Sequence, residues 1–304
     1  MKSLKKEDLQ LKNLSLLKEN EKECKLCPRL CKVDRRIKKG FCKSSLKPGV
    51  ASYNLHRGEE PFISGTNGSG TVFFHHCTMS CIFCQNFPIS QIHDFPEVSE
   101  ENLAKIFLEL QKKGAHNINL VTPTHFTVAI ASAIFIAIKE GLQIPVVWNS
   151  NGYENVNIIR LLEPFVDIWL PDLKYFDNNL ALKFSNVSDY KEYATYAIAE
   201  MFRQKGNLKL NEKGIAISGL VIRHLVLPDC IENSKEVLRF IANSISRDAS
   251  VSIMSQYFPA WKAVDIKSLN RTLTSKEYDT VIDFALSLGL KNALIQDLSG
   301  EGGC

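Results

Sequence analysis

The sequence predicts an α/β protein built around a parallel sheet, and two observations support this fold class. Between residues 71 and 295, short apolar runs of strand type alternate with longer segments whose apolar residues recur at helical spacing. Such an alternation places helices outside a parallel sheet, which can be an open doubly wound sheet or a full or partial barrel. The composition, with 45% hydrophobic and 23% charged residues, excludes a disordered chain, a collagen-like chain and a coiled coil.

Six β/α units and one extra strand can be placed in order. The expected strands cover residues 71–74, 118–121, 146–148, 166–170, 220–227, 251–254 and 293–295. The first helix carries Leu103, Phe107 and Leu110 on one face and stops at Gly114. The other helices lie at residues 127–140, 156–162, around 194–201, around 237–241, and after the capping box of Thr274 and Glu277. In folds of this kind the functional residues lie at the C-terminal ends of the strands.

The first 50 residues differ in charge from the rest of the chain, so we expect a basic N-terminal segment at 1–50 and a barrel at 51–304. Residues 1–50 hold 15 Lys and Arg against 6 Asp and Glu, or +9, whereas residues 51–304 hold 22 against 27, or −5. Residues 1–23 are expected to be a charged helix or a loose tail. A basic segment can bind nucleic acid, but this one lacks a set of aromatic residues for base stacking, so nucleic acid is not the expected partner.

No membrane or secretory segment is expected, and the sequence predicts a cytoplasmic protein. The longest nearly apolar stretch, residues 128–138, is about half of the ~20 residues that a membrane span needs. Seven of the nine cysteines lie in the first 84 residues. Because cytosolic thiols stay reduced, this clustering indicates metal binding rather than disulfides.

Three cysteines follow the first barrel strand directly, in the order Cys77-Thr-Met-Ser-Cys81-Ile-Phe-Cys84. A structural zinc site is closed by four ligands, whereas a [4Fe-4S] cube ligated by three thiolates keeps one iron open for chemistry. The alternative is a zinc knuckle in which His75 or His76 supplies the fourth ligand.

The spacing of these cysteines, with Phe83 before the third, resembles the cluster loop of the radical S-adenosylmethionine (radical SAM) enzymes. Further segments resemble the branch related to pyruvate formate-lyase activating enzyme, and together they span most of the chain. They are the Cys-Lys-Leu-Cys-Pro-Arg-Leu-Cys stretch from Cys24 and residues 58–61, 117–125, 171–174 and 222–228. The resemblance implies a (β/α)6 partial TIM-type barrel, open on one side, and an oxidoreductase that cleaves SAM reductively to a 5′-deoxyadenosyl radical. It also implies that Cys77, Cys81 and Cys84 bind the cluster and that Phe83 encloses the adenine side.

Two motifs of the activating enzymes can be carried over to this sequence as SAM-binding residues. Their Asp-Thr-Asn-Gly after the third strand matches Asn149-Ser-Asn-Gly, and their Asp-x-Lys after the fourth matches Asp172-Leu-Lys174. In the family these residues help hold a monovalent cation near SAM; Asn149 removes one negative charge there. The alternative for Asp172 and Lys174 is a solvent-facing ion pair.

One family motif is missing from this sequence, the Gly-Gly-Glu that grips the SAM amino group. Thr122-Pro-Thr-His125 stands in its place, so Thr122 or His125 is a candidate for that role. Arg223 and His224 are adjacent in a strand and must point to opposite faces, so at most one of them faces the barrel interior.

Cys24, Cys27, Cys31 and Cys42 form a second set of four thiols, which suits either zinc or a second Fe-S cluster. By resemblance, the leading substrate is a backbone glycine of a glycyl-radical enzyme, and a low-potential electron donor such as flavodoxin or ferredoxin is implied. Another protein or a small molecule remains open as substrate. The rival hypothesis is a non-enzymatic zinc or Fe-S binding module, which a fourth ligand at the Cys77 loop would favour.

Overall fold

The computed structural model describes residues 2–298 and contains one nine-stranded sheet. The strands are hydrogen bonded in the order β1-β2-β3-β4-β5-β7-β8-β9, and β6 pairs only with β7. Their bounds are β1 Val50–His56, β2 Ser69–Phe74, β3 Ile118–Val121, β4 Val146–Ser150, β5 Ile168–Pro171, β6 Lys209–Leu210, β7 Ala216–Leu225, β8 Ser250–Met254 and β9 Asn292–Ile295. All pairs from β2 to β9 along this path are parallel, while β1 runs antiparallel to β2.

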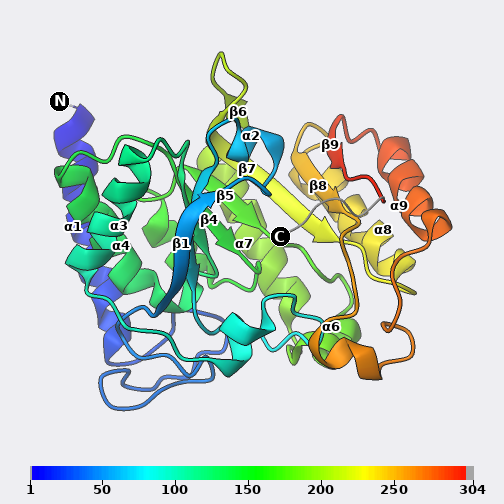
Figure 1. The fold of residues 1–304 in the computed structure, drawn as a ribbon, viewed down its shortest axis with the longest axis horizontal. Helices are drawn as coiled ribbons and strands as arrows, with labels where there is room; N and C mark the ends of the chain where they lie inside the picture. The colour runs from blue at the N-terminus through cyan, green and yellow to red at the C-terminus, as the bar shows by residue number, and fades with distance from the viewer. Residues whose placement is uncertain (1, 299–304) are drawn as a thin grey trace.

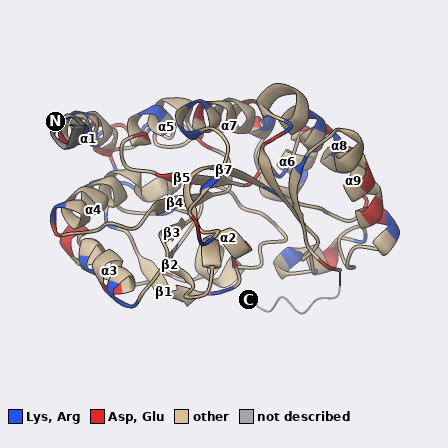
Figure 2. Cartoon of the chain, turned by 90° about the horizontal axis from the view of Figure 1, so that it is seen from above, with Lys and Arg blue, Asp and Glu red and all other residues tan. Residues whose placement is uncertain are grey.

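Nine α-helices are present in the described part of the chain, and most lie on the outer side of the curved sheet (Figures 1 and 2). Their bounds are α1 Lys2–Lys18, α2 Pro61–Ser64, α3 Glu100–Lys112, α4 Thr127–Lys139, α5 Val156–Leu162, α6 Asn178–Ser185, α7 Tyr190–Lys205, α8 Ile231–Phe240 and α9 Ser275–Ser287. Short helical turns lie at Glu19–Glu21, Pro88–Ile92, Thr124–Phe126, Trp261–Asp265 and, directly after α8, Ile241–Ile245.

The prediction of a (β/α)6 partial barrel is confirmed. Each parallel strand from β2 to β8 is followed by at least one outer helix, and β9 is the extra strand. The two ends of the strand order, β1 and β9, do not pair with each other within residues 2–298. The sheet therefore curves without closing, because six parallel β/α units are too few to form a complete eight-unit barrel.

The apolar patterns of the sequence form the layer between the sheet and its helices. Helix α3 buries Leu103, Phe107 and Leu110 completely, as its spacing predicts. Trp148 of β4 and Trp169 of β5 are fully buried in the same layer, with ring centroids 6.4 Å apart. These side chains leave little freedom for the strands to shift, so the strand ends that follow them are held in fixed positions.

A second, smaller apolar cluster lies on the inner side of the curved sheet. Ile63 of α2 is fully buried against Val147, Ile168, Leu170 and Val221. Helix α2 thus covers one end of the barrel interior, and its glutamates Glu59 and Glu60 precede it in the chain. The polar part of the interior begins where this apolar cluster ends.

The basic N-terminal segment packs against the outer helices. Helix α1 contacts α4 and α5, and its Leu17 is fully buried. Gln10 and Asn13 of α1 donate hydrogen bonds to the Pro164 and Leu161 carbonyl oxygens at 2.9 and 2.8 Å. Residues 2–23 therefore form a docked helix followed by a turn, which is the first of the two alternatives that the sequence left open. None of the helices described in residues 2–298 combines the length and apolar character needed to cross a membrane.

Candidate functional site

The cysteine loop Cys77–Cys84 starts three residues after β2, at the C-terminal end of the barrel strands. Its backbone is fastened to the end of α6, because Ser80 and Ile82 donate N–H hydrogen bonds to the Ser185 and Phe184 carbonyl oxygens at 3.2 and 2.9 Å. The Gln91 side chain donates to the Cys81 carbonyl oxygen at 2.9 Å. The loop is thus held by α6, which lies about 100 residues away in the sequence, and by Gln91, which follows it closely.

Each of the three sulfurs has a polar neighbour. Asn151 Nδ2, in the loop after β4, donates to Cys77 Sγ at 3.2 Å, and Ser185 Oγ donates to Cys81 Sγ at 3.0 Å. Cys84 Sγ lies 3.2 Å from Ser90 Oγ. Hydrogen bonds to sulfur stabilise the thiolate form that binds metal and tune the potential of an Fe-S cluster.

Lys174 supplies a positive charge beside the thiols. Burial raises the pKa of the Cys81 thiol to about 12, and the nearby Lys174 ammonium counteracts this rise. Burial by itself would lower the pKa of Lys174, but Asp172 and the thiolates of Cys81 and Cys84 raise it to about 12. Lys174 is therefore charged at neutral pH, and it faces the three-cysteine loop.

Asp172 and Lys174 form a largely buried ion pair rather than a solvent-facing one. Lys174 Nζ lies 2.5 Å from Asp172 Oδ2, and the two side chains are 15% and 20% exposed. The Tyr190 hydroxyl of α7 lies 2.8 Å from the Asn151 carbonyl oxygen and 3.0 Å from the Asp172 carbonyl oxygen. It also accepts the backbone N–H of Lys174 at 3.0 Å. Tyr190 thus joins the loops after β4 and β5, which carry the two SAM-binding motifs expected from the sequence.

Asn149, the residue that replaces the family's aspartate, faces the barrel interior. Its Oδ1 accepts a hydrogen bond from Arg223 Nη1 at 3.3 Å. Arg223 also donates to Glu60 at 2.7 and 2.6 Å and pairs with Glu59. Arg223 brings a positive charge to the Asn149 side chain, and the carboxylates of Glu59 and Glu60 pair with that charge.

The adjacent residues Arg223 and His224 point to opposite faces, as the sequence predicts, and it is Arg223 that lies inside. His224 is fully buried on the other side, with Nδ1 2.6 Å from the Leu173 carbonyl oxygen and Nε2 2.9 Å from Ser234 Oγ. Both ring nitrogens are therefore occupied, and His224 supports the packing of α8 on β7.

The remaining sequence candidates lie in the packing around the loop. Phe83 is 4% exposed and meets Tyr257 edge to face, with ring centroids 6.1 Å apart. His125 is 1% exposed, and its Nε2 lies 2.7 Å from the His75 carbonyl oxygen. Burial lowers the pKa of His125 to about 3. His125 is thus a neutral packing residue. Thr122, the other candidate for holding the SAM amino group, adjoins the site, because its N–H donates to the Asn149 carbonyl oxygen at 2.9 Å.

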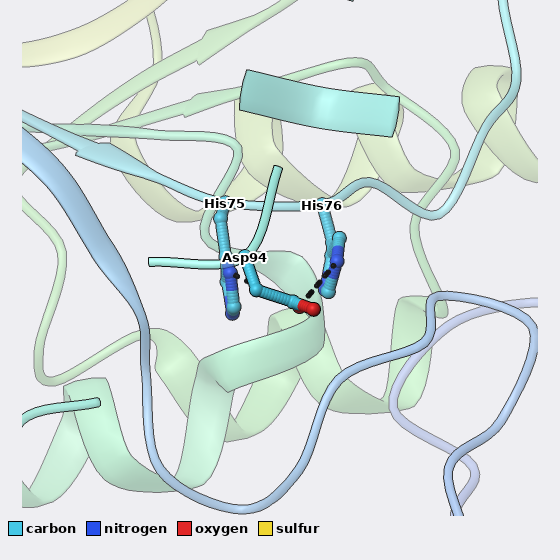
Figure 3. A group of neighbouring side chains, drawn as sticks. All are labelled: His75, His76 and Asp94. Carbon is cyan, nitrogen blue, oxygen red and sulfur yellow. Dashed lines mark ion pairs between the residues drawn. The ribbon is translucent and has the colours of Figure 1, made fainter. Parts of the chain in front are cut away.

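His75 and His76 both face Asp94 (Figure 3). His76 Nε2 lies 3.2 Å from Asp94 Oδ1, and its Nδ1 lies 3.1 Å from Ser44 Oγ. His75 Nδ1 accepts the backbone N–H of Phe95 at 3.1 Å. These hydrogen bonds occupy both ring nitrogens of His76 and the Nδ1 lone pair of His75, which speaks against either histidine as a fourth ligand for the Cys77 loop.

Sequence reasoning missed Asn151, Ser185 and Tyr190 as parts of the site. Asn151 lies within the matched Asn-Ser-Asn-Gly motif, and this position marks it as a candidate. Of that motif, however, only Asn149 was assigned to SAM binding. Ser185 and Tyr190 stand on α6 and α7, at positions that no motif marks. Their roles depend on how those helices pack against the strand ends, which the order of residues does not reveal.

The comparisons with known proteins agree with this architecture. A model of the radical SAM superfamily matches residues 71–241. The chain is 32% identical over 276 residues to the uncharacterised protein MJ0674 of Methanocaldococcus jannaschii, covering 87% of this chain and 74% of that protein.

One solved structure of low sequence identity is similar in fold, and a second is reported with it. Streptococcus suis SuiB bound to S-adenosylmethionine matches with a TM-score of 0.50 and 14% identity over 74% of this chain, and this chain spans half of the SuiB chain. A domain of pyruvate-formate lyase-activating enzyme from Bacteroides vulgatus matches with a TM-score of 0.38 and 14% identity, covering 65% of this chain and 91% of that domain.

Proposed function

Since the chain belongs to the radical SAM superfamily, which uses a [4Fe-4S] cluster and SAM, we propose that it abstracts a hydrogen atom from a backbone glycine of a glycyl-radical enzyme. The observation that carries this proposal is the meeting of three separate strand ends at one place. Asn151 after β4 contacts Cys77, and Lys174 after β5 faces Cys81 and Cys84. These are the same two motifs that the sequence shares with the glycyl-radical activating enzymes.

We assign the three thiols of Cys77, Cys81 and Cys84 to the cluster. The donor set suits it: the sulfurs of Cys77 and Cys81 accept hydrogen bonds, the sulfur of Cys84 lies beside the Ser90 hydroxyl, and both neighbouring histidines are engaged elsewhere. One iron would then stay free for the amino and carboxylate groups of SAM. When bound, cluster and SAM together supply a one-electron cleavage that yields methionine and a hydrogen-abstracting deoxyadenosyl group. A flavodoxin or ferredoxin is the proposed electron donor.

Asn149, Asp172 and Lys174 are the proposed SAM-binding side chains, with Phe83 on the adenine side. The Asp172–Lys174 pair is 15–20% exposed, so a ligand seated there meets preorganised charges in a site of low dielectric. Asp172 can accept from an amino group and Lys174 can pair with a carboxylate. Tyr190 holds both loops in this arrangement, because its hydroxyl accepts the Lys174 N–H and lies within hydrogen-bond distance of the Asn151 and Asp172 carbonyl oxygens.

A protein substrate is supported by the shape of the sheet. Strands β1 and β9 leave the barrel unclosed among the described residues, so a loop of a partner protein can approach the strand ends from the side. A docked protein loop also keeps water and reductant away from a reactive radical, which a small diffusible ligand does less well. These two features favour a glycine in a protein loop over a free metabolite.

The test follows the hydrogen atom. Each glycyl-radical enzyme that the organism encodes is prepared with deuterated glycine and incubated anaerobically with this protein, SAM and reductant. We expect deuterium from the labelled enzyme in 5′-deoxyadenosine. A parallel reaction with unlabelled enzyme should give a doublet-type glycyl radical signal by electron paramagnetic resonance, because the remaining α-hydrogen splits the signal. The variant Lys174→Met should bind SAM at least tenfold more weakly while keeping its cluster, and the variant Cys77→Ala/Cys81→Ala/Cys84→Ala serves as the inactive control.

Two results would separate the parts of the proposal. If 5′-deoxyadenosine forms but carries no deuterium with any of these partners, the cleavage of SAM stands and the glycyl-radical substrate is wrong. If neither 5′-deoxyadenosine nor a SAM-dependent change in the cluster spectrum is found, the assignment of the three-cysteine loop is wrong as well.

A further inference from the structure

Four more thiols gather in the N-terminal segment, apart from the proposed SAM site. Cys24, Cys27, Cys31 and Cys42 are all free, so no disulfide joins them. The chain folds back on itself to bring them together: the Cys24 N–H donates to the Val33 carbonyl oxygen at 3.0 Å and the Lys32 N–H to the Cys24 carbonyl oxygen at 2.9 Å. The Leu30 N–H donates to the Cys27 carbonyl oxygen at 3.1 Å and the Lys43 N–H to the Gly40 carbonyl oxygen at 3.0 Å, so a tight turn follows Cys27 and another contains Cys42.

The loop that carries these thiols has little else to stabilise it. Between α1 with its following turn and β1, the described chain forms no helix or strand longer than a single bridge. Leu30, Lys32 and Lys43 adopt positive φ angles of 42°, 52° and 57°, which are unfavourable for residues other than glycine. A strained segment with so few buried apolar side chains needs another source of stability, and metal binding is the usual one in small cysteine-rich units.

The spacing of the sulfurs distinguishes between two kinds of metal centre. With Zn–S bonds of about 2.3 Å, the four sulfurs around a zinc ion lie roughly 3.8 Å apart. Among residues 2–298, no three thiol sulfurs all lie within 4.8 Å of one another. The one group of three potential metal ligands in these residues that meets this distance is His75, His76 and Asp94. An Fe-S cube spreads its ligands more widely, because each thiolate binds a separate iron at a corner.

The Cys77 loop provides an internal standard for this comparison. Its three sulfurs also fail to come mutually within 4.8 Å, and the Met79 N–H donates to Cys77 Sγ, two residues back, at 3.4 Å. The N-terminal set also has a backbone N–H group that donates to a sulfur. Phe41 donates its N–H to Cys31 Sγ at 3.5 Å. In both sets, therefore, no three sulfurs come as close together as the ligands of one zinc ion, and a backbone N–H donates to a sulfur.

We propose that Cys24, Cys27, Cys31 and Cys42 bind a second [4Fe-4S] cluster, with a cysteine on every iron and no open position for SAM. Close packing around the site supports this assignment, because a Cβ on Gly40 would lie 3.1 Å from Cys31 Sγ. The backbone at Gly40 thus approaches the sulfur more closely than a larger residue would permit.

The second cluster would adjoin the SAM-binding loop. Arg29 follows Cys27 by two residues, and its guanidinium donates to the Thr78 carbonyl oxygen at 3.1 Å and the Asn186 carbonyl oxygen at 2.6 Å. Thr78 is the residue after Cys77, and Asn186 is the residue after Ser185, which donates to Cys81. One side chain therefore connects the two cysteine loops.

The test counts metals and asks which cluster responds to SAM. Anaerobically reconstituted wild type should hold about eight irons per chain and no stoichiometric zinc. The variant Cys77→Ala/Cys81→Ala/Cys84→Ala should keep about four irons, with a reduced-state electron paramagnetic resonance signal that SAM does not alter. The variant Cys27→Ala/Cys31→Ala/Cys42→Ala should also keep about four irons, with a signal that SAM does alter. Cys230→Ala, which removes a buried cysteine outside both sets, should match the wild type.

The outcomes are decisive even if the N-terminal variant fails to fold, because the Cys77-loop variant leaves the N-terminal set intact. A single zinc per chain in that variant, or no metal at all, overturns the proposal. The result is also separable from the proposed function. Wild type with about eight irons and no response to SAM would refute the SAM site and leave the second cluster in place.

Discussion

At the scale of single residues, Glu154 carries a buried carboxyl group that hydrogen bonds satisfy only in part. Its Oε1 accepts from Thr124 Oγ1 at 2.7 Å and from Trp148 Nε1 at 3.3 Å. Its Oε2 is buried without a partner, and burial raises the pKa of Glu154 to about 7. This carboxyl lies between β4 and the start of α4, so it belongs to the packing that holds the strand ends and not to the polar interior.

The raised pKa makes stability depend on pH. A carboxyl whose folded pKa exceeds its unfolded value stabilises the fold fully below the unfolded pKa, and the contribution is lost as pH rises through the folded pKa of about 7. We expect the free energy of unfolding to fall by about 1–3 kcal/mol between pH 6 and pH 9 in the wild type. The variant Glu154→Gln should flatten this dependence, and chemical denaturation across the pH range measures it. Equal slopes in the two proteins would show that another group titrates.

At the scale of elements, the close approach of two loops shapes the proposed SAM site. Gly152, after β4, has a φ of +77°, and a Cβ there would lie 2.0 Å from the Asp172 carbonyl oxygen and 2.9 Å from the Tyr190 hydroxyl. The loops after β4 and β5 can therefore touch only because this residue has no side chain.

The variant Gly152→Ala should push these loops apart and weaken SAM binding by tenfold or more, because Asn151 and Asp172 would both move. Gly141→Ala is the matched control: Gly141 also has a positive φ, +105°, but a Cβ there meets nothing within 4 Å. The control should lose about 1 kcal/mol of stability from backbone strain and keep its SAM affinity. The spectral change of the reduced cluster on titration with SAM gives both affinities. If Gly152→Ala and Gly141→Ala bind SAM with equal affinity, the site does not depend on the close approach of the loops after β4 and β5.

The elements that the sequence predicted well are those whose pattern is local. Strands β3 and β4 and helices α3 and α5 follow from apolar spacing and from polar or glycine ends, and their observed bounds agree within two residues. Strand β1 was missed because it is an antiparallel edge strand with three exposed central residues, so it lacks a buried apolar run. Helix α6 was missed because it is only one part of a longer connection, yet it carries Ser185 at the cluster loop.

The candidate site shows the same division. The cysteine spacing and the two strand-end motifs are readable in the sequence, since the chemistry requires those residue types in that order. Arg223 and Tyr190 take their places through pairings over long sequence separations, 163 residues to Glu60 and 39 residues to Asn151. Such contacts depend on the tertiary fold, so no local pattern could have assigned them.

At the scale of the whole molecule, the N-terminal segment is part of the barrel's surface rather than a free tail. Arg35 is 5% exposed and donates to the His125 and Ser45 carbonyl oxygens, while Arg29 reaches Thr78 and Asn186 and lies 3.7 Å from the centre of the Phe41 ring. Two arginines thus fasten the cysteine-bearing segment to the loops around the proposed SAM site. Two of the positive charges in this basic segment, those of Arg29 and Arg35, therefore make contacts within the chain.

The Arg29 contacts lead to a prediction about how the segment and the barrel depend on each other. Arg29→Gln loses two hydrogen bonds from a charged group and the contact with Phe41, which should lower stability by about 2 kcal/mol. Arg36→Gln is the matched control, because Arg36 pairs only with Asp34 at the surface and such pairs contribute about 0–1 kcal/mol. Limited proteolysis under anaerobic conditions should cut Arg29→Gln within residues 24–48 several times faster than wild type or Arg36→Gln. If all three proteins are cut at the same rate, the link through Arg29 is not needed to keep the segment on the barrel.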